Sequence, residues 1–295
     1  MINMSFFSYK GGSGRTTLTY NTMPYIIEKL QPTNEEPIIL LDMDIDSKGM
    51  SILLGRTSAV NTIEILQGAF DATLYDDKNA INHPFFSNLA KVGTDFGLPD
   101  SQEGAVLFVS AHTTRDNTYL NNHNNYDGRG TSLNRLVRLC ECYGCKALVM
   151  DTPTGSQLSS TVSLDISDVI VTVMRITRQF REGTIEHIRR LDNNYCDKKF
   201  VIVPNAVPYV DQKHSNIIDR IFADMRNIFG NGLTNNIMNT DFIKNGLMGI
   251  NEVQILKLNE YNLFIESKTR ELTGDEQSAL GKYKQLAEIV CNEEN

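Results

Sequence analysis

Short hydrophobic runs recur along the chain and alternate with longer segments that have the period of an amphipathic helix. Apolar runs of this kind are typical of strands buried on both faces of a parallel sheet. The expected strands are SFF near residue 6 and the runs at 37–44, 105–110, 146–151, 168–174 and 200–204. The pattern predicts a doubly wound α/β fold, with a mainly parallel sheet and helices on both faces.

Two segments carry the clearest helical signals. The apolar residues between 217 and 229 share one helical face, and Thr273 with Glu276 has the spacing of a capping box that opens a last helix. A further helix is expected to start near Thr16. Pro24 lies inside it and would kink that helix or end it early.

The chain of 295 residues, 41% of them hydrophobic, can bury a full core, and we expect a single domain over residues 1–295. An irregular stretch at about 71–104 and a polar patch at 121–130 (NNHNNYDGRG) are expected to be surface loops or a family-specific insertion. The first residues lack a secretory pattern and no apolar run approaches the roughly 18 residues of a membrane span, so we expect a cytoplasmic protein.

Charge and cysteine content narrow the function classes. With 28 Lys+Arg against 36 Asp+Glu, the net charge of −8 gives the whole molecule no attraction to DNA or anionic lipid, although a local basic face stays compatible with DNA binding. The acidic end of the chain lacks a basic amphipathic stripe, so membrane insertion is not expected. Cys140, Cys142 and Cys145 lie close together without a second cluster or a nearby histidine, which favours ordinary thiols over a metal site.

The segment FFSYKGGSGRTTLT at residues 6–19 places a glycine-rich turn between an expected strand and an expected helix. Gly11, Gly12 and Gly14 let the backbone curl so that several N–H groups point inward, and the helix adds its positive N-terminal end. The segment therefore predicts a phosphate-binding loop.

Two hydroxyl groups follow this loop. Thr16 is placed to offer its hydroxyl to Mg²⁺, and Thr17 can donate to an α-phosphate. The loop matches the variant x-K-G-G-x-G-K-S/T-S/T in every position except one, where Arg15 replaces the last lysine.

The variant loop resembles the deviant Walker A motif of the ParA/MinD family of P-loop ATPases. Three more segments fall in that family's order: LLDMD at 40–44, LVMDTPTG at 148–155 and VPNAVP at 203–208. Residues 241–256 are similar to the segment beside the adenine in such proteins. The resemblance implies ATP and Mg²⁺ as ligands and a homodimer that forms when ATP is bound.

The resemblance also implies roles for single residues. Lys10 would be the signature lysine that reaches across a nucleotide-sandwich dimer, and Asp44 the carboxylate that orients the attacking water. Asp42 would line the same pocket. Asp151 would hold Mg²⁺ through water.

The implied nucleotide contacts come from the loop and from one strand end. Asn205 would read the adenine edge, with Pro208 beside the ring. The loop contacts are Gly11, Gly12, Ser13, Gly14, Arg15, Thr16 and Thr17.

The chain departs from the family pattern at two places. Arg15 keeps the charge of the usual lysine, but its longer planar fork directs its donors differently. The usual D-x-D-P-Q is replaced by Asp42-Met43-Asp44-Ile45-Asp46. We therefore expect nucleotide binding with slow ATP hydrolysis.

The leading hypothesis is an ATP-dependent dimerising switch that positions DNA or a protein cargo. An alternative is a nucleotide-binding scaffold with little turnover, like the polar-localisation ATPase homologues of pilus assembly. A bacterial tyrosine kinase of the same fold is disfavoured by Lys10 and by the lack of a tyrosine-rich tail.

Five arginines follow the fifth expected strand and have two interpretations. One is a DNA-binding face. The other, which we favour, is a solvated helix face with internal ion pairs to Glu182 and Glu186. These arginines are Arg175, Arg178, Arg181, Arg189 and Arg190.

Overall fold

The computed structural model divides the chain into two compact units. The first contains Met1–Ser5, Leu30–Pro153 and Gln157–Ser167, and the second contains Phe6–Lys29, Thr154–Ser156 and Asp168–Asn295. The structure describes residues 1–66, 84–111, 129–155, 157–192, 198–208, 215–227, 239–242, 249–253, 256 and 261–292. A single domain over 1–295 stays a prediction.

The first unit contains a sheet with the strand order β3-β4-β2-β5. Three strands run parallel, β2 (Ile38–Asp42), β4 (Val106–Val109) and β5 (Ala147–Thr154), and β3 (Ala90–Lys91) is antiparallel to β4. The strands β2, β4 and β5 are buried along almost their whole length, as expected for apolar runs covered on both faces. The helices of this unit are α2 (Gly49–Leu54), α3 (Thr62–Leu66), α4 (Pro84–Ser87), α5 (Arg129–Tyr143) and α6 (Leu158–Ile166).

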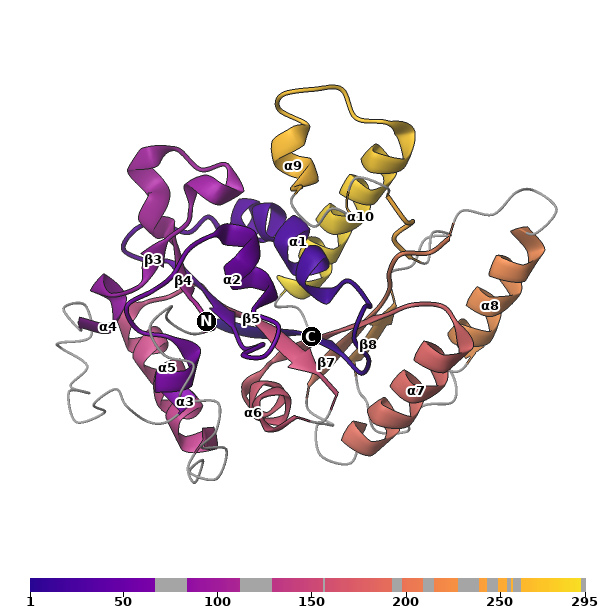
Figure 1. Ribbon diagram of the computed structural model, residues 1–295, viewed down its shortest axis with the longest axis horizontal. Helices are drawn as coiled ribbons and strands as arrows, with labels where there is room; N and C mark the ends of the chain where they lie inside the picture. The colour runs from indigo at the N-terminus through magenta and orange to yellow at the C-terminus, as the bar shows by residue number, and fades with distance from the viewer. Residues whose placement is uncertain are drawn as a thin grey trace. The chain divides into compact units, whose positions relative to one another are not determined.

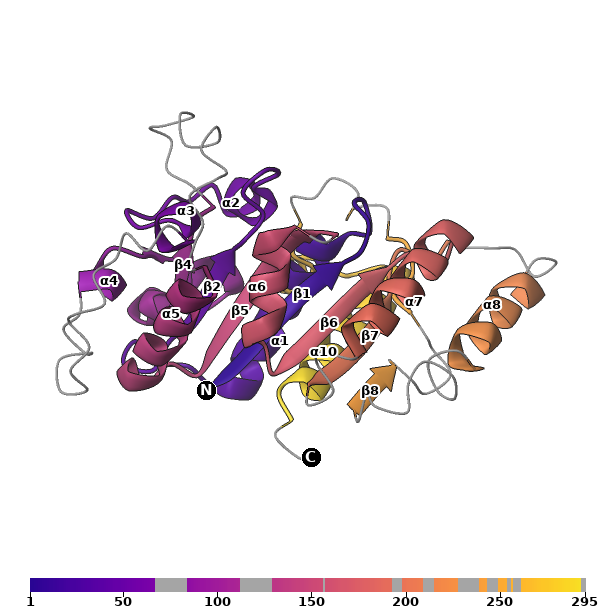
Figure 2. The same cartoon turned by 90° about the horizontal axis from the view of Figure 1, so that it is seen from below.

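The second unit contains the parallel strands β6 (Val169–Met174), β7 (Lys199–Pro204) and β8 (Asn239–Phe242), while β1 (Ile2–Ser8) is shared between the units. Figure 1 shows α7 on one side of these strands and α1 and α10 on the other, and Figure 2 shows α7 in front of β7. The helices are α1 (Arg15–Leu30), α7 (Arg178–Asp192), α8 (Ser215–Asn227), α9 (Leu263–Glu266) and α10 (Gly274–Val290).

The doubly wound α/β fold is confirmed, and every strand expected from the sequence is present. The capping box is confirmed at the start of α10, where the side chains of Thr273 and Glu276 each accept the other's backbone N–H. The helix after the loop begins at Arg15 and continues through Pro24 to Leu30, so an early end at Pro24 is wrong, while a kink there stays a prediction.

Residues 84–104 are not the irregular surface loop that the sequence predicts. They form α4, β3 and the 3₁₀ helices η3 (Thr94–Phe96) and η4 (Asp100–Ala105). Phe85 and Phe86 are buried, and the Phe86 ring stacks on Tyr143 of α5. Elements this short have no measurable hydrophobic period, which is why the sequence pattern missed them.

Parts of two other predictions lie outside the described residues. These are 67–83 of the first stretch and 121–128 of the polar patch, whose last two residues instead begin α5. The helix expected at 217–229 is confirmed as far as Asn227, the last residue of α8, and Phe222 and Met225 of its apolar face are buried, whereas Ile217 is exposed. Whether residues 71–104 are an insertion stays a prediction.

Candidate functional site

The glycine-rich turn between β1 and α1 has the backbone that a phosphate-binding loop needs. Gly12 has φ 79° and Gly14 has φ 80°, a region that favours glycine. A Cβ on Gly14 would lie 2.6 Å from Nδ2 of Asn205. Glycine at 14 is therefore required both by the backbone and by the close approach of this side chain.

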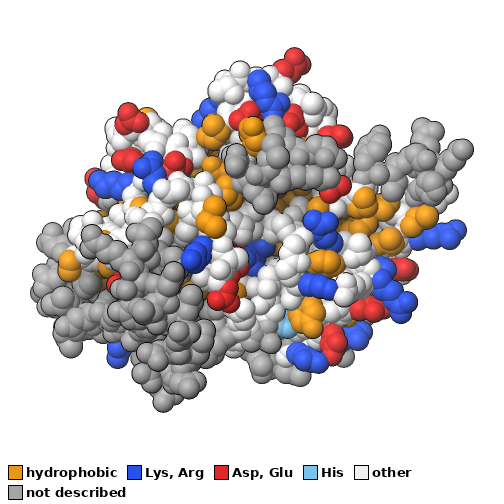
Figure 3. Space-filling model, in the orientation of Figure 1, with side chains coloured by type: hydrophobic (Ala, Val, Ile, Leu, Met, Phe, Trp, Pro, Cys, Tyr) orange, Lys and Arg blue, Asp and Glu red, His pale blue; other side chains and the backbone are white. Residues whose placement is uncertain are grey.

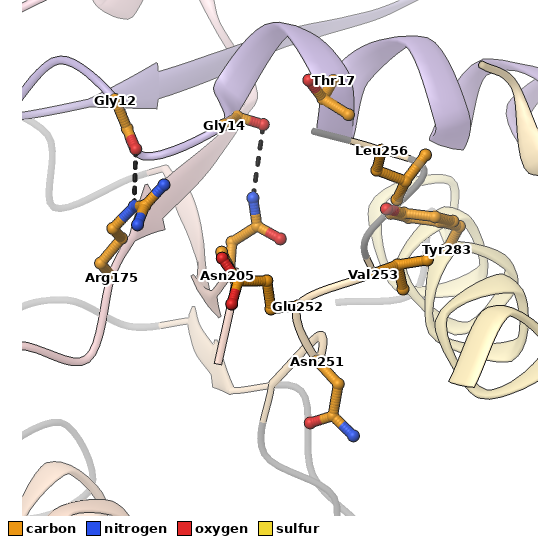
Figure 4. A pocket seen from close by; sticks show the side chains of 11 residues that line it. Gly12, Gly14, Thr17, Arg175, Asn205, Asn251, Glu252, Val253, Leu256 and Tyr283 are labelled. Carbon is orange, nitrogen blue, oxygen red and sulfur yellow. Dashed lines mark hydrogen bonds between the residues drawn. The ribbon is translucent and has the colours of Figure 1, made fainter. Parts of the chain in front are cut away.

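Side chains from the ends of β6 and β7 hold three consecutive carbonyl groups of the turn. Nε of Arg175 donates to the Gly12 carbonyl (2.7 Å), and Nδ2 of Asn205 donates to the Gly14 carbonyl (3.4 Å) (Figure 4). The same Nδ2 also donates to the Ser13 carbonyl (2.9 Å). Because a trans peptide is planar, the N–H that follows each carbonyl points the opposite way. The N–H groups of residues 13, 14 and 15 therefore point away from these donors, as in a cradle for an anion.

A cavity of about 310 Å³ opens beside this turn, and all of its lining residues belong to the second unit. Asn205 lies under the loop, while Val253, Leu256 and Tyr283 form an apolar group on another side (Figure 4). The combination of a few polar groups with an apolar wall is typical of a small-molecule site. The lining residues are Gly12, Gly14, Thr17, Arg175, Asn205, Ala206, Asn251, Glu252, Val253, Leu256 and Tyr283.

Backbone bonds fix the wall of the cavity that follows β7. The N–H of Asn205 donates to the Met174 carbonyl of β6 (2.8 Å), and Val207 exchanges bonds with Ile250 (3.0 Å) and Glu252 (2.8 Å). Ala206 between them has φ 50°, an uncommon value for a residue with a Cβ. These contacts place Asn205 and Glu252 at one cavity.

Two carboxylates lie side by side in the first unit, at the carboxyl ends of neighbouring parallel strands. Asp42 of β2 is in register with Asp151 of β5, and both are fully buried. Burial, and then the charge of Asp151, raises the pKa of Asp42 to about 7, against hydrogen bonds from Ser51 and Asp44 that lower it. A pair of buried carboxylates is a donor set that suits Mg²⁺, because the cation offsets their repulsion.

Ser51 orients Asp42, and sequence reasoning did not identify it. Its N–H (2.8 Å) and its hydroxyl (2.7 Å) both donate to Oδ2 of Asp42. Its hydroxyl oxygen accepts the N–H of Ala111 (3.0 Å). The only signal in the sequence was a serine shortly after an acidic strand end, which is too common to be informative.

Asp44, expected to orient water, is buried in the turn after β2. Its Oδ1 accepts the N–H of Ser47 (3.1 Å), and its own N–H donates to Oδ1 of Asp42 (3.2 Å). Lys48, which follows, has φ 52°. The Asp44 carboxylate thus stabilises a local turn, and a catalytic role for it stays a prediction.

Lys10 and Tyr9 of the loop lie against α7. Nζ of Lys10 is 5.5 Å from the centre of the Phe180 ring, and the Tyr9 ring is 5.5 Å from that of His187. The Lys10 ammonium therefore has an aromatic contact within the chain, and its role as the signature lysine stays a prediction.

The arginine-rich face of α7 is partly neutralised by ion pairs. Arg178 pairs with Glu182 and Arg190 with Glu186, each one helical turn apart. Figure 3 shows blue and red side chains intermixed over this part of the surface. The ion-paired, solvated face that we favoured is confirmed for these two arginines.

The remaining candidate residues are placed as follows. Arg15 is buried at the start of α1 and Thr16 follows it, whereas Pro208 is exposed and does not line the cavity.

Cys140 and Cys145 are buried together, and their mutual hydrogen bond raises the pKa of the Cys140 thiol. Among the described helices, none is long and apolar enough to cross a membrane.

Comparison with known proteins rests on structure. No family model matches the sequence, and no curated protein does. Apo McdA of Cyanothece superposes with a TM-score of 0.64 at 14% identity, covering 97% of this chain and 98% of that chain. The chain has the MinD/ParA fold. The septum site-determining protein MinD of Pyrococcus horikoshii, complexed with Mg-ADP, gives 0.59 at 15% identity, covering 99% of this chain and 96% of that one. A ParA family ATPase of Chlorobium tepidum gives 0.61 at 11%, covering 97% and 98%.

Proposed function

We propose that this chain is an ATP-binding switch of ParA/MinD type, which dimerises when ATP is bound, hydrolyses ATP slowly and positions DNA or a protein cargo. The observation that carries the proposal is the orientation of the loop. Its carbonyls at 12, 13 and 14 are held by Arg175 and Asn205, so the N–H groups that follow them are free of this contact and face the opposite side.

The cavity supports a purine nucleotide as the ligand. Asn205 uses its amide nitrogen on the loop carbonyls, which leaves Oδ1 as the acceptor that it can offer. An acceptor suits the exocyclic amino group of adenine. Val253, Leu256 and Tyr283 supply an apolar wall for the ring.

The acidic pair supports Mg²⁺ as the accompanying cation. In the proposal Asp151 would hold the ion through water and the hydroxyl of Thr16 would be a ligand, while Asp42 is the strand neighbour of Asp151. When bound, Mg²⁺ supplies positive charge to the phosphates. MinD of Pyrococcus horikoshii, which shares the fold, is complexed with Mg-ADP.

Slow turnover follows from Arg15 in the proposal. The buried guanidinium keeps a positive charge at the start of α1, so phosphate binding persists. Its fork cannot place that charge where the compact ammonium of lysine would lie, and positioning dominates the rate of phosphoryl transfer.

The test is the molar mass in solution by light scattering, with Mg-ATP and then with Mg-ADP. We expect a dimer with ATP and a monomer with ADP, and Lys10→Ala should lose the dimer while it still binds nucleotide. Lys268→Ala is the matched control, because Lys268 lies 4.4 Å from the Phe264 ring in a similar cation–π contact away from the loop.

A mass that does not respond to nucleotide, in a protein that binds it, would contradict the switch. That result would favour the scaffold hypothesis instead. The Arg15 substitution and the missing D-P-Q are the features that speak for this alternative.

A further inference from the structure

Arg175 differs from its neighbours in the arginine-rich segment. Arg178 and Arg190 pair with glutamates of α7. Arg175, directly after β6, turns to the glycine-rich loop and lines the cavity (Figure 4). The sequence grouped it with the other arginines of a solvated helix face, and its actual position is beside the glycine-rich loop and the cavity.

The bond from Arg175 to Gly12 sets the orientation of one peptide of the loop. With φ near +79°, Gly12 has access to backbone conformations closed to other residues, so its peptide is also easily turned. The donor Nε at 2.7 Å keeps the carbonyl on the Arg175 side and the N–H of Ser13 on the other. Without this donor, the carbonyl can turn toward a bound phosphate and repel it.

The bond to Gly12 leaves the terminal N–H groups of Arg175 available for another ligand. Within the described residues no carboxylate forms an ion pair with Arg175, and the Gly12 carbonyl takes only its Nε–H. The terminal nitrogens carry four more N–H donors in a fixed fork that matches phosphate oxygens. In Figure 4 the guanidinium lies at the edge of the loop, beside the same cavity.

We propose that Arg175 is a phosphate-binding residue of this site: its Nε–H fixes the Gly12 carbonyl, and its terminal N–H groups bind a phosphate of the nucleotide at the edge of the loop, where the nucleotide would pass from the cavity to the N–H side of the loop. This inference rests on the proposed function, since it requires a nucleotide at the loop. It adds a cation from the end of β6 to the loop residues Lys10 and Arg15.

The experiment compares Mg-ADP with adenosine, which lacks phosphate, by titration calorimetry on the full chain. Arg175→Ala should weaken Mg-ADP binding about tenfold or more, as for a lost hydrogen bond to a charged group, and should leave adenosine binding within about twofold. Arg175→Lys should recover part of the ADP affinity, because it restores charge without the fork. Arg178→Ala, on the same segment but paired with Glu182, is the control and should match wild type.

Salt dependence separates a charge contact from a purely structural role. Wild type should lose ADP affinity more steeply with added salt than Arg175→Gln, which keeps an amide donor but no charge. If the alanine variant does not fold, the Lys and Gln variants carry the same comparison.

Two results would overturn the inference while leaving the proposed function intact. One is ADP binding by the Arg175 variants within twofold of wild type, and the other is an equal loss for ADP and adenosine. A wild-type protein that binds no Mg-ADP would overturn both proposals, and it is recognised before any variant is tested.

Discussion

The side-chain amide of Asn262 donates a hydrogen bond to the backbone carbonyl of Tyr20, at 2.9 Å. Tyr20 lies four residues before Pro24 in α1, and proline has no N–H to give to the carbonyl four residues back. Asn262 therefore supplies the donor that the helix lacks, while its Oδ1 caps α9 by accepting the N–H of Phe264 (3.1 Å). A proline inside a helix is accommodated by a residue that lies 242 positions after the carbonyl it satisfies.

The first prediction concerns this donor. Asn262→Asp keeps an oxygen for the α9 cap but removes the amide, so we expect the free energy of unfolding to fall by about 1 kcal/mol. In a Pro24→Ala background, residue 24 regains an N–H for the Tyr20 carbonyl, and the same substitution should cost clearly less. Urea unfolding of the four proteins measures the coupling. A cost independent of residue 24 would contradict the account of the proline.

The second prediction concerns Gly183 of α7, which lies against the Tyr9 ring. A Cβ at 183 would come within 2.4 Å of Cε1 and 2.6 Å of Cδ1 of Tyr9. We expect Gly183→Ala to destabilise by about 1 kcal/mol through this overlap. In a Tyr9→Ala background the overlap is absent, and the helix preference for alanine should make the change stabilising by about 0.5–1 kcal/mol. Denaturant midpoints with the same sign in both backgrounds would refute this.

Local sequence patterns predicted the structural features that depend on residues close together in the sequence. The apolar runs located the strands, the glycines located the turn before α1, and the spacing of Thr273 and Glu276 located the start of α10. The strand β8, with the mostly polar sequence NTDF, carries no such pattern and was missed. It pairs with β7 through backbone bonds, which any side chains allow.

The sequence could not show contacts that the fold alone creates. Arg175 and Gly12 are 163 positions apart, and nothing near either residue indicates their bond. The sequence shows only that Arg175 is basic and lies near other arginines. That pattern is as typical of a solvated surface as of a binding site. Its place at the loop follows from the adjacency of the β6 end and the turn within the second unit.

The third prediction concerns acid stability and Glu276 at the start of α10. Arg270 donates two hydrogen bonds to this carboxylate, both 2.9 Å long, and they are the main cause that lowers the Glu276 pKa from 4.5 to about 2. Because the pKa is lower in the folded state, the stabilisation is complete above about pH 4.5 and is lost as the pH falls toward 2.

Glu276→Gln tests this without removing the cap, since glutamine also fits a capping box. We expect a loss of about 1 kcal/mol at pH 7 for this partly exposed pair, and a difference from wild type that disappears between about pH 4.5 and pH 2. Thermal unfolding across that range is the measurement. A constant difference at every pH would show that the charge is not responsible.

The last prediction concerns the substitution in the loop itself. Arg15 is buried at the first position of α1, directly after the carbonyls held by Asn205, so its guanidinium has little freedom to change place. A lysine there has a compact ammonium on a shorter, more flexible stem, which can adjust to the phosphates. We expect Arg15→Lys to raise the rate of ATP hydrolysis about tenfold or more, because small errors of position are costly in phosphoryl transfer.

Single-turnover phosphate release at saturating ATP isolates this step from binding, and Arg178→Lys on the exposed face of α7 should leave the rate unchanged. Equal rates for wild type and Arg15→Lys would mean that the arginine is not what slows the reaction, and attention would move to the turn around Asp44, where the other departure from the family pattern lies.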